Sequence, residues 1–274
     1  MVESKDRADA YAITRIAGNF GWAFGPAIGG FVAASSYSIL FIISGGMTLI
    51  SSLIIAIFLK GLKQRSQNDK PFKLSDMFSY KENEIMLKFA VCIFFIYLVF
   101  AQLIAPFSLY SVDLIGISKV HLGILFMLNG LIVAFFQLPV TRFLRKYRFT
   151  SQLIMGSVIF ACGYIMVGFS TSFILFMITM VVITFGEIWV SPPVLALTAN
   201  MAPKGRTGRY MGIYGFAVTF GWSMGPVIGN TLLDWFKPNY IYAWGIISLL
   251  AIISAAGFKM MSKIIPDYLN RPNK

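Results

Sequence analysis

Glu187 is the acidic residue of this sequence that stands deepest inside an apolar segment. It lies between the uncharged runs 149–186 and 188–203, whereas the other Asp and Glu residues stand near the ends of such runs or in polar stretches. A charged carboxylate at the centre of a membrane helix costs about 2.5–3.5 kcal/mol on insertion scales, and desolvation favours the neutral acid. A carboxyl group in this setting can carry a proton or attract a cation. The alternative is a structural role as a hydrogen-bonding group.

Two consecutive prolines follow Glu187 within two helical turns. Pro192 and Pro193 lack the backbone N–H that a helix needs, so they leave the carbonyls of Ile188 and Trp189 without their usual donors. An interrupted, polar helix near the middle of a membrane is a common feature of transporter binding sites. The segment is therefore predicted to couple a proton and a substrate at Glu187.

Arg15, Gln102, Asn129 and Gln137 are the other candidates for a polar cavity inside apolar segments. Arg15 stands about two turns into the first such segment. Its alternative, which we favour, is to extend its charged head to the membrane surface. The three amides can face a substrate, but we favour the alternative that they form hydrogen bonds between helices, which requires no functional role.

The cysteine and histidine content argues against metal, cofactor and hydrolase chemistry. Cys92 and Cys162 both lie inside apolar segments, and His121 is the single histidine. We expect no disulfide, no metal site and no cofactor. With one histidine at the end of a span, a Ser/His/Asp triad is also disfavoured, so the protein is predicted not to be an enzyme.

The elements that would position these residues are membrane-spanning helices. Hydrophobic residues make up 57% of the 274 residues, charged residues 12%, and the mean hydropathy is +0.75. Runs of about 20 apolar residues can cross a hydrocarbon core of roughly 30 Å. The chain is predicted to be an all-α polytopic membrane protein with eight transmembrane helices, and its charged start predicts no cleavable signal peptide. The spans are expected at 9–33, 38–60, 87–110, 121–143, 151–170, 173–198, 209–233 and 239–261.

The net charge of +12 is distributed unevenly between the two sides of this topology. Of the 23 Lys and Arg residues, all except Lys119 and Lys237 fall on one side. Cytoplasmic loops carry such an excess of basic residues. We therefore expect a multi-pass protein of the cell membrane with both termini in the cytoplasm. Its basic loops would meet anionic lipid of the bilayer, and we expect no nucleic acid as a partner.

The glycine pattern of the first span recurs near the end of the chain. FGWAFGPAIGG at 20–30 aligns with FGWSMGPVIGN at 220–230, which indicates an internal repeat. Glycines four residues apart form one ridge of a helix and allow transmembrane helices to approach closely, while an interior proline can kink the helix. The positions concerned are Gly21, Gly25, Pro26, Gly29 and Gly30 in the first copy and Gly221, Gly225, Pro226 and Gly229 in the second.

At these residues the sequence resembles the drug:proton antiporters of the major facilitator superfamily. GWAFGPAIGG at 21–30 is similar to the antiporter motif GxxxGPxxGG of the fifth span in that family. GWSMGPVIGN at 221–230 falls where the eleventh span would lie, with Asn230 in place of the last glycine.

Other segments extend the resemblance over almost the whole chain. QLIAPFSLYSVDLIGIS at 102–118 is similar to the seventh span and the loop after it, and FGEIWVSPP at 185–193 is similar to the tenth span of multidrug members. LNGLIVAFFQLPVTRFLRKYR at 128–148 is similar to the eighth span and the basic loop that follows. That loop lacks the Gly and Asp of the family's usual signature, so no gating role is assigned to it.

The resemblance implies a partial major facilitator fold that corresponds to spans five to twelve. Residues 1–60 would form the last two helices of the N-terminal half, and 61–86 the central cytoplasmic loop. Residues 87–274 would form the complete six-helix C-terminal half and a cytoplasmic tail. The span that holds Glu187 would then line the central cavity of the transporter.

The function that the resemblance implies is proton-coupled efflux of drugs or other amphipathic small molecules by secondary active transport. An uptake carrier of the same fold is one alternative, although it would need substrate-specific polar clusters, of which the sequence shows few. A remnant without transport activity is another, because the chain begins just before the fifth span. A channel or receptor would require pore-lining charges or a large outer domain, and the sequence shows neither.

Overall fold

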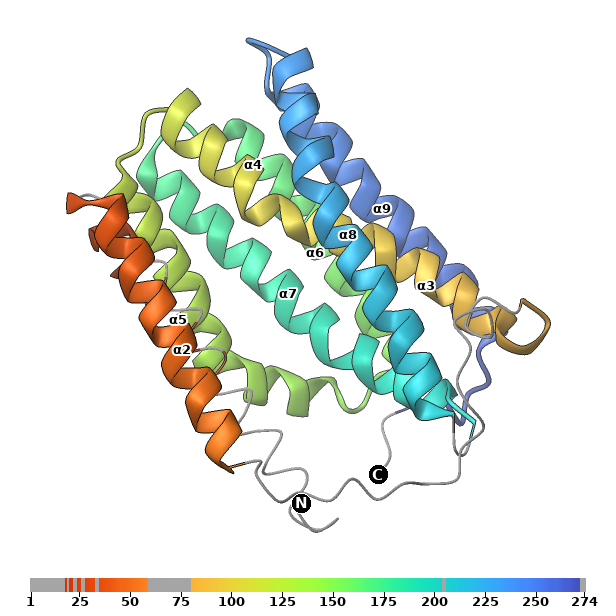
Figure 1. Ribbon diagram of the computed structural model, residues 1–274. Helices are drawn as coiled ribbons and strands as arrows, with labels where there is room; N and C mark the ends of the chain where they lie inside the picture. Colours follow the sequence, from red (N-terminus) through yellow and green to blue (C-terminus); the bar gives the residue numbers. More distant parts are fainter. Residues whose placement is uncertain are drawn as a thin grey trace.

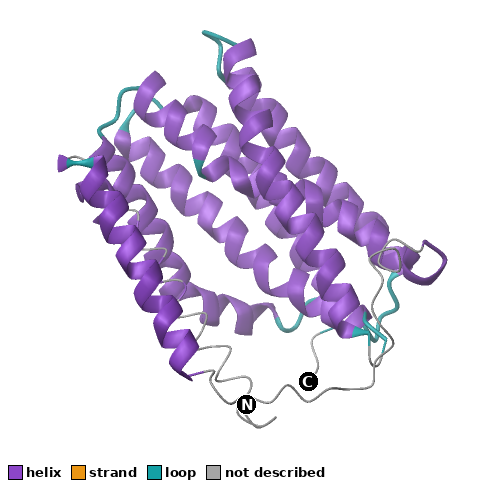
Figure 2. Ribbon diagram, viewed as in Figure 1, coloured by secondary structure: helices purple, strands orange, loops and turns teal. Residues whose placement is uncertain are grey.

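The computed structural model describes residues 35–58, 80–203 and 206–271, together with parts of 18–32. Arg15, Pro26 and the loop 59–79 lie outside the described residues. Across the part of the chain that is described, the regular secondary structure is helical and contains no strand (Figure 2). The predicted all-α class is therefore confirmed.

Seven helical segments within the described residues are long and apolar enough to cross a membrane. They agree to within a few residues with the last seven predicted spans, while the first predicted span lies largely outside the described residues. The helices are α2 (Tyr37–Phe58), α3 (Tyr80–Phe100), α4 (Ala105–Ser108), α5 (Lys119–Leu144), α6 (Phe149–Phe169), α7 (Phe173–Met201), α8 (Thr207–Trp235) and α9 (Ile241–Ile264).

The span that begins with α3 is interrupted in the middle. After α3 the chain forms a 3₁₀ turn at Ala101–Leu103, then α4, and then a π-helical turn at Leu109–Leu114. Pro106 lies in α4 and cannot donate to the carbonyl of Gln102, which accounts for a break at this level. The interruption makes Gln102 part of an irregular segment rather than of a straight helix.

Helix α7 contacts α5 and α6 extensively, and α8 and α3 less extensively (Figure 1). α6 packs on both α7 and α9, and α3 packs on both α8 and α9. Large side chains such as Phe160, Tyr164 and Trp244 fill the interior between these helices and are completely buried. In α2, by contrast, no side chain is buried within the described residues.

The first residues of α3 and the residues just before α5 have backbone conformations that mark where each helix begins. The predicted central loop 61–86 overlaps α3, which already begins at Tyr80 and has a non-helical residue at Asn83 (φ −129°, ψ 18°). Before α5, Gly116 has a φ of 88°, a conformation that favours glycine. Ser118 then caps α5 by accepting a hydrogen bond from the backbone N–H of His121 at 3.1 Å.

Candidate functional site

Glu187 lies at the centre of the 29-residue helix α7 and is half-buried. Its Oε2 accepts a hydrogen bond from Nδ2 of Asn129 on α5, at 3.0 Å. The same Nδ2 group donates to Oγ1 of Thr184 at 2.9 Å, and Asn129 is fully buried. An amide NH₂ has two hydrogens, so it can serve both acceptors at once. The carboxyl group is thereby held against α5 in either protonation state, because the oxygen that accepts needs no proton.

Gln137 lies two turns further along α5 and donates a hydrogen bond to a backbone carbonyl at the proline break in α7. Its Nε2 donates to the carbonyl oxygen of Ile188 at 3.3 Å and to Oγ1 of Thr141 at 3.0 Å. The Ile188 carbonyl is the one that Pro192 leaves without a helical donor. A side chain of the neighbouring helix thus supplies the missing hydrogen bond, as polar satisfaction inside a membrane requires.

The contact between α5 and α7 near Glu187 also includes apolar side chains. Ile132, Val133 and Ile188 form a buried cluster that is separate from the main hydrophobic core. Leu125 and Phe126, nearer the start of α5, belong to the main core instead. The hydrogen bonds of Asn129 and Gln137 therefore add polar contacts on either side of this apolar cluster.

Gln102 occupies a different place, at the break after α3. It is fully buried, and its Nε2 donates to the carbonyl of Leu98 at 3.0 Å and to the carbonyl of Gly225 at 2.8 Å. Its Oε1 faces Gly229, where an added Cβ would collide with it. Gln102 therefore joins the broken helix to α8 and does not line the Glu187 site.

The second glycine ridge is the surface of α8 on which α3 rests. A Cβ added at Gly221 would lie 2.8 Å from the carbonyl oxygen of Phe94, and one at Gly225 would lie 2.7 Å from that of Leu98. Glycine is thus required for the backbones to approach this closely. At Gly21, Gly25 and Gly30 an added Cβ would meet no described atom within 4 Å, and at Gly29 it would meet only Leu40 at 4.0 Å.

Two residues near Glu187 were not predicted from the sequence. Thr184 shares the Asn129 amide with Glu187, and its own hydroxyl donates to the carbonyl of Met180 at 2.7 Å. Tyr164 on α6 is completely buried and donates to the carbonyl of Phe100 at 3.2 Å. It lies one turn after Phe160, whose ring is 3.0 Å from the position of a Cβ added at Gly186, the residue before Glu187. Thr184 precedes Glu187 by three residues and so shares its helix face, which is the signal that could have identified it.

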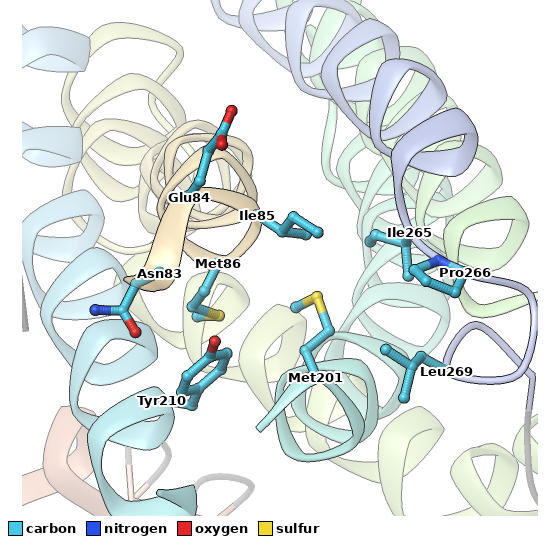
Figure 3. A pocket seen from close by; sticks show the side chains of 9 residues that line it. All are labelled: Asn83, Glu84, Ile85, Met86, Met201, Tyr210, Ile265, Pro266 and Leu269. Carbon is cyan, nitrogen blue, oxygen red and sulfur yellow. The ribbon is translucent and has the colours of Figure 1, made fainter. Parts of the chain in front are cut away.

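The end of the bundle that holds the basic loops contains a small cavity (Figure 3). It has a volume of about 260 Å³. It lies between the first turns of α3, the end of α7, the start of α8 and the segment after α9. Its lining residues are Asn83, Glu84, Ile85, Met86, Met201, Tyr210, Ile265, Pro266 and Leu269. None of the predicted site residues lines it, so it is separate from the Glu187 site.

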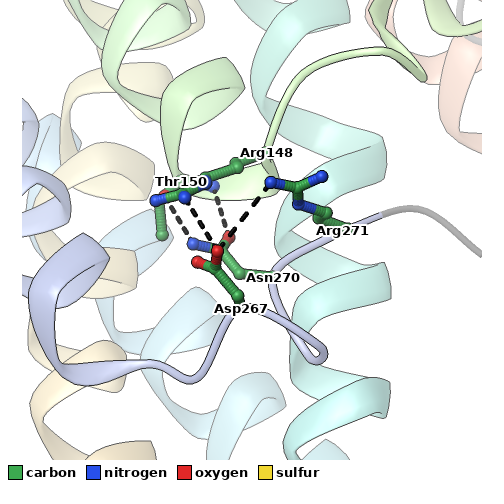
Figure 4. Close-up of polar contacts among 5 residues, drawn as sticks. All are labelled: Arg148, Thr150, Asp267, Asn270 and Arg271. Carbon is green, nitrogen blue, oxygen red and sulfur yellow. Dashed lines mark hydrogen bonds and ion pairs between the residues drawn. The ribbon is translucent and has the colours of Figure 1, made fainter.

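The segment after α9 is fixed to the start of α6 by Asn270, which is fully buried (Figure 4). The backbone oxygen of Asn270 accepts from the N–H of Phe149 at 2.8 Å, and its Oδ1 accepts from the N–H of Thr150 at 2.9 Å. Asp267 adds ion pairs with Arg148 at 2.8 Å and with Arg271 at 3.8 Å. A distant segment thus caps the first N–H groups of α6, which have no helical partner.

Comparison with known proteins identifies the family. The sequence of the chain matches the family model of the Major Facilitator Superfamily over residues 1–226 and, in a second match, over residues 91–262. The chain belongs to this superfamily. The resemblance to the superfamily is therefore confirmed.

Relatives of the chain are similar over part of their own length. The uncharacterized MFS-type transporter YttB of Bacillus subtilis (strain 168) is 28% identical over 233 residues, which cover 82% of this chain and 57% of YttB. A Na(+), Li(+), K(+)/H(+) antiporter of Planococcus maritimus is 26% identical over 141 residues, which cover 52% of this chain and 32% of the antiporter. The chain thus spans about half the length of YttB and less of the antiporter.

A solved structure shows the same fold. The crystal structure of a POT family transporter in complex with a thioalcohol-conjugated peptide matches with a TM-score of 0.55 and 15% sequence identity. The match covers 96% of this chain and 55% of that transporter. At this identity the likeness concerns the fold alone.

Proposed function

We propose that the chain acts in a proton-coupled efflux transporter for amphipathic or cationic small molecules, with Glu187 as the coupling carboxylate. The observation that carries this proposal is the hydrogen bond from Asn129 to Glu187 at the middle of two contacting helices. It places a titratable group at a defined position within the part of the bundle that a membrane would enclose. The name of the cation/proton antiporter among the relatives supports the exchange of a cation for protons.

The coupling would follow from competition at one carboxyl group. A neutral Glu187 holds the proton, and an ionised Glu187 attracts a cationic substrate. If each state excludes the other ligand, entry of a proton drives release of the substrate, which is a reciprocal linkage of two binding free energies. Asn129 acts as a positioning residue, because it holds the carboxyl group in both states.

Transport in membrane vesicles tests this proposal, with the chain expressed together with any upstream spans that its gene encodes. We expect Glu187→Gln, which keeps shape and hydrogen bonding but cannot titrate, to abolish efflux driven by a proton gradient, and Glu187→Asp to retain part of it. Thr184→Val is the matched control, because it removes a neighbouring hydroxyl and keeps the carboxyl group. Full efflux by Glu187→Gln would refute the proposal.

The nature of the cation can be tested in the same vesicles. An organic cation would need an apolar site beside Glu187, whereas an inorganic cation would not. Replacing the organic substrate with Na⁺, Li⁺ or K⁺ separates these cases. Proton exchange that requires the organic compound supports drug efflux, and exchange with the metal ions alone would assign the chain to cation/proton antiport.

A further inference from the structure

A groove on the outside of the helix bundle lies between α5 and α6. Both helices pack on α7 but make few contacts with each other, so α7 forms the floor of the groove. The groove has a volume of about 510 Å³. Its lining side chains are Pro139, Val140 and Phe143 from α5, Ile159 from α6, and Phe185 and Trp189 from α7.

The lining of the groove is apolar and suited to a hydrocarbon chain. The lining side chain of Phe143 is 55% exposed, so the groove is open to the surface of the bundle at this end. Ile159 lies ten residues after the start of α6 at Phe149, which corresponds to about 15 Å along the helix axis. This distance is about half of a hydrocarbon core of roughly 30 Å. The groove therefore extends over the depth of one leaflet.

Cationic side chains stand at the end of the groove where α5 ends. Nζ of Lys146 lies 4.2 Å from the ring centroid of Phe143, which itself lines the groove. Arg142 is in the last turn of α5, and Arg145 follows it as the C-cap residue. Within the described part of the chain, none of these three basic residues forms an ion pair, whereas the nearby Arg148 pairs with Asp267.

We propose that this groove binds one acyl chain of an anionic phospholipid, whose phosphate group is held by Arg142, Arg145 and Lys146. Basic residues at the end of a span lie at the level of the lipid headgroups, and anionic lipid is attracted to them with an energy that grows with each Lys or Arg. The apolar lining would contact the acyl chain, and the unpaired cations would contact the phosphate group. The cations lie at the end of the span, nearer the membrane surface than the apolar lining, as the headgroup of such a lipid does. This proposal does not depend on the transport function.

Quenching of Trp189 fluorescence by brominated lipids tests the proposal. The purified chain is reconstituted in bilayers that contain increasing fractions of phosphatidylglycerol or phosphatidylcholine with brominated acyl chains. The signal of Trp189 is obtained by difference from the variant Trp189→Phe. We expect phosphatidylglycerol to reach half-maximal quenching at a mole fraction at least about fivefold lower than phosphatidylcholine, since a fivefold preference already corresponds to the contribution of one Lys or Arg near the membrane surface.

Three variants test whether the preference for phosphatidylglycerol arises at this groove. Replacement of Arg142, Arg145 and Lys146 by Gln should abolish the preference for phosphatidylglycerol while quenching by phosphatidylcholine remains. Replacement of Lys259 and Lys263 by Gln, at the corresponding end of α9, should leave the preference intact. Ile159→Phe should narrow the groove and reduce quenching by both lipids, and size-exclusion profiles establish that each variant is folded.

Equal quenching of the unaltered chain by both lipids would overturn the proposal. Loss of the preference in the Lys259 and Lys263 variant would also overturn it, because the preference would then arise from the total charge of that surface. Unchanged quenching in Ile159→Phe would show that the acyl chain does not occupy the groove.

Discussion

Nδ2 of Asn129 on α5 and Oε2 of Glu187 on α7 are 3.0 Å apart and join two helices near the centre of the bundle. This bond lies one turn away from the break that Pro192 introduces in α7. The Glu187 site therefore combines a titratable group, a fixed amide donor and an irregular backbone within a short stretch of one helix pair. Each of these features can be tested separately.

The bond from Gln137 to the Ile188 carbonyl leads to a test by double substitution. Gln137→Leu should lower the free energy of unfolding by about 1–3 kcal/mol, because it leaves a buried carbonyl without a donor. Pro192→Ala restores a backbone N–H that can donate to the same carbonyl. In that background Gln137→Leu should cost less than half as much, as measured by thermal unfolding in detergent. An equal cost in both backgrounds would show that Gln137 acts in some other way.

The close approach of α3 and α8 predicts different effects of alanine at two glycines of α8. Gly225→Ala would place a Cβ 2.7 Å from the carbonyl oxygen of Leu98 and should destabilise the protein by about 1–3 kcal/mol. Gly215→Ala meets no described atom within 4 Å and should be neutral or slightly stabilising. Thermal unfolding of the two variants makes the comparison. Equal midpoints would mean that the ridge does not determine the packing.

The hydrogen bonds of Asn270 predict that the segment after α9 stabilises the start of α6. Asn270→Ala should increase hydrogen exchange at the amides of Phe149 and Thr150, because a side-chain acceptor is lost and the segment is less firmly held. Arg271→Ala is the control. Its ion pair with Asp267 is exposed at 65% and 55% of the two side chains, so its loss should change the exchange rates little. Unchanged exchange in Asn270→Ala would contradict this role.

The distribution of basic residues predicts the orientation of the bundle. Single cysteines at Thr171 and Lys237, which are both exposed, should react with a membrane-impermeant reagent added to intact cells. Single cysteines at Arg145 and Tyr268 should react only after the membrane is made permeable. Labelling of a cysteine at position 268 from outside would contradict the predicted orientation. The single cysteines are introduced into a variant that lacks Cys92 and Cys162.

The sequence was sufficient to predict the seven spans that lie in the described part of the chain, because hydropathy is a property of each segment alone. The uncharged runs 120–141 and 210–233, for example, lie within three residues of the ends of the observed spans Lys119–Leu144 and Thr207–Trp235. The break after α3 was not predicted, since the span expected at 87–110 is apolar over most of its length and predicts one continuous helix, although it contains Pro106. The identity of Glu187 as the acid in the interior also followed from its position alone.

The pairing of side chains could not be predicted in the same way. Asn129 and Glu187 are 58 residues apart in the sequence, and their contact depends on the relative height and rotation of α5 and α7. From the sequence alone, Gln102, Asn129 and Gln137 could not be distinguished from one another. In the structure their side chains donate to different partners, the Gly225 carbonyl, the Glu187 carboxyl group and the Ile188 carbonyl, respectively. Asn270 carried no signal at all, because a short polar tail has no periodicity that would reveal its contact with α6.

Proton release on substrate addition is the most direct test of the central claim. The protein is purified in detergent with any upstream spans that its gene encodes, held in weakly buffered solution, and mixed with a cationic substrate. The competition at Glu187 predicts that the unaltered protein releases protons and that Glu187→Gln, folded to the same extent, does not. Equal proton release from both proteins would contradict the account, because Glu187 would then be a structural hydrogen-bonding residue and the coupling group would lie elsewhere.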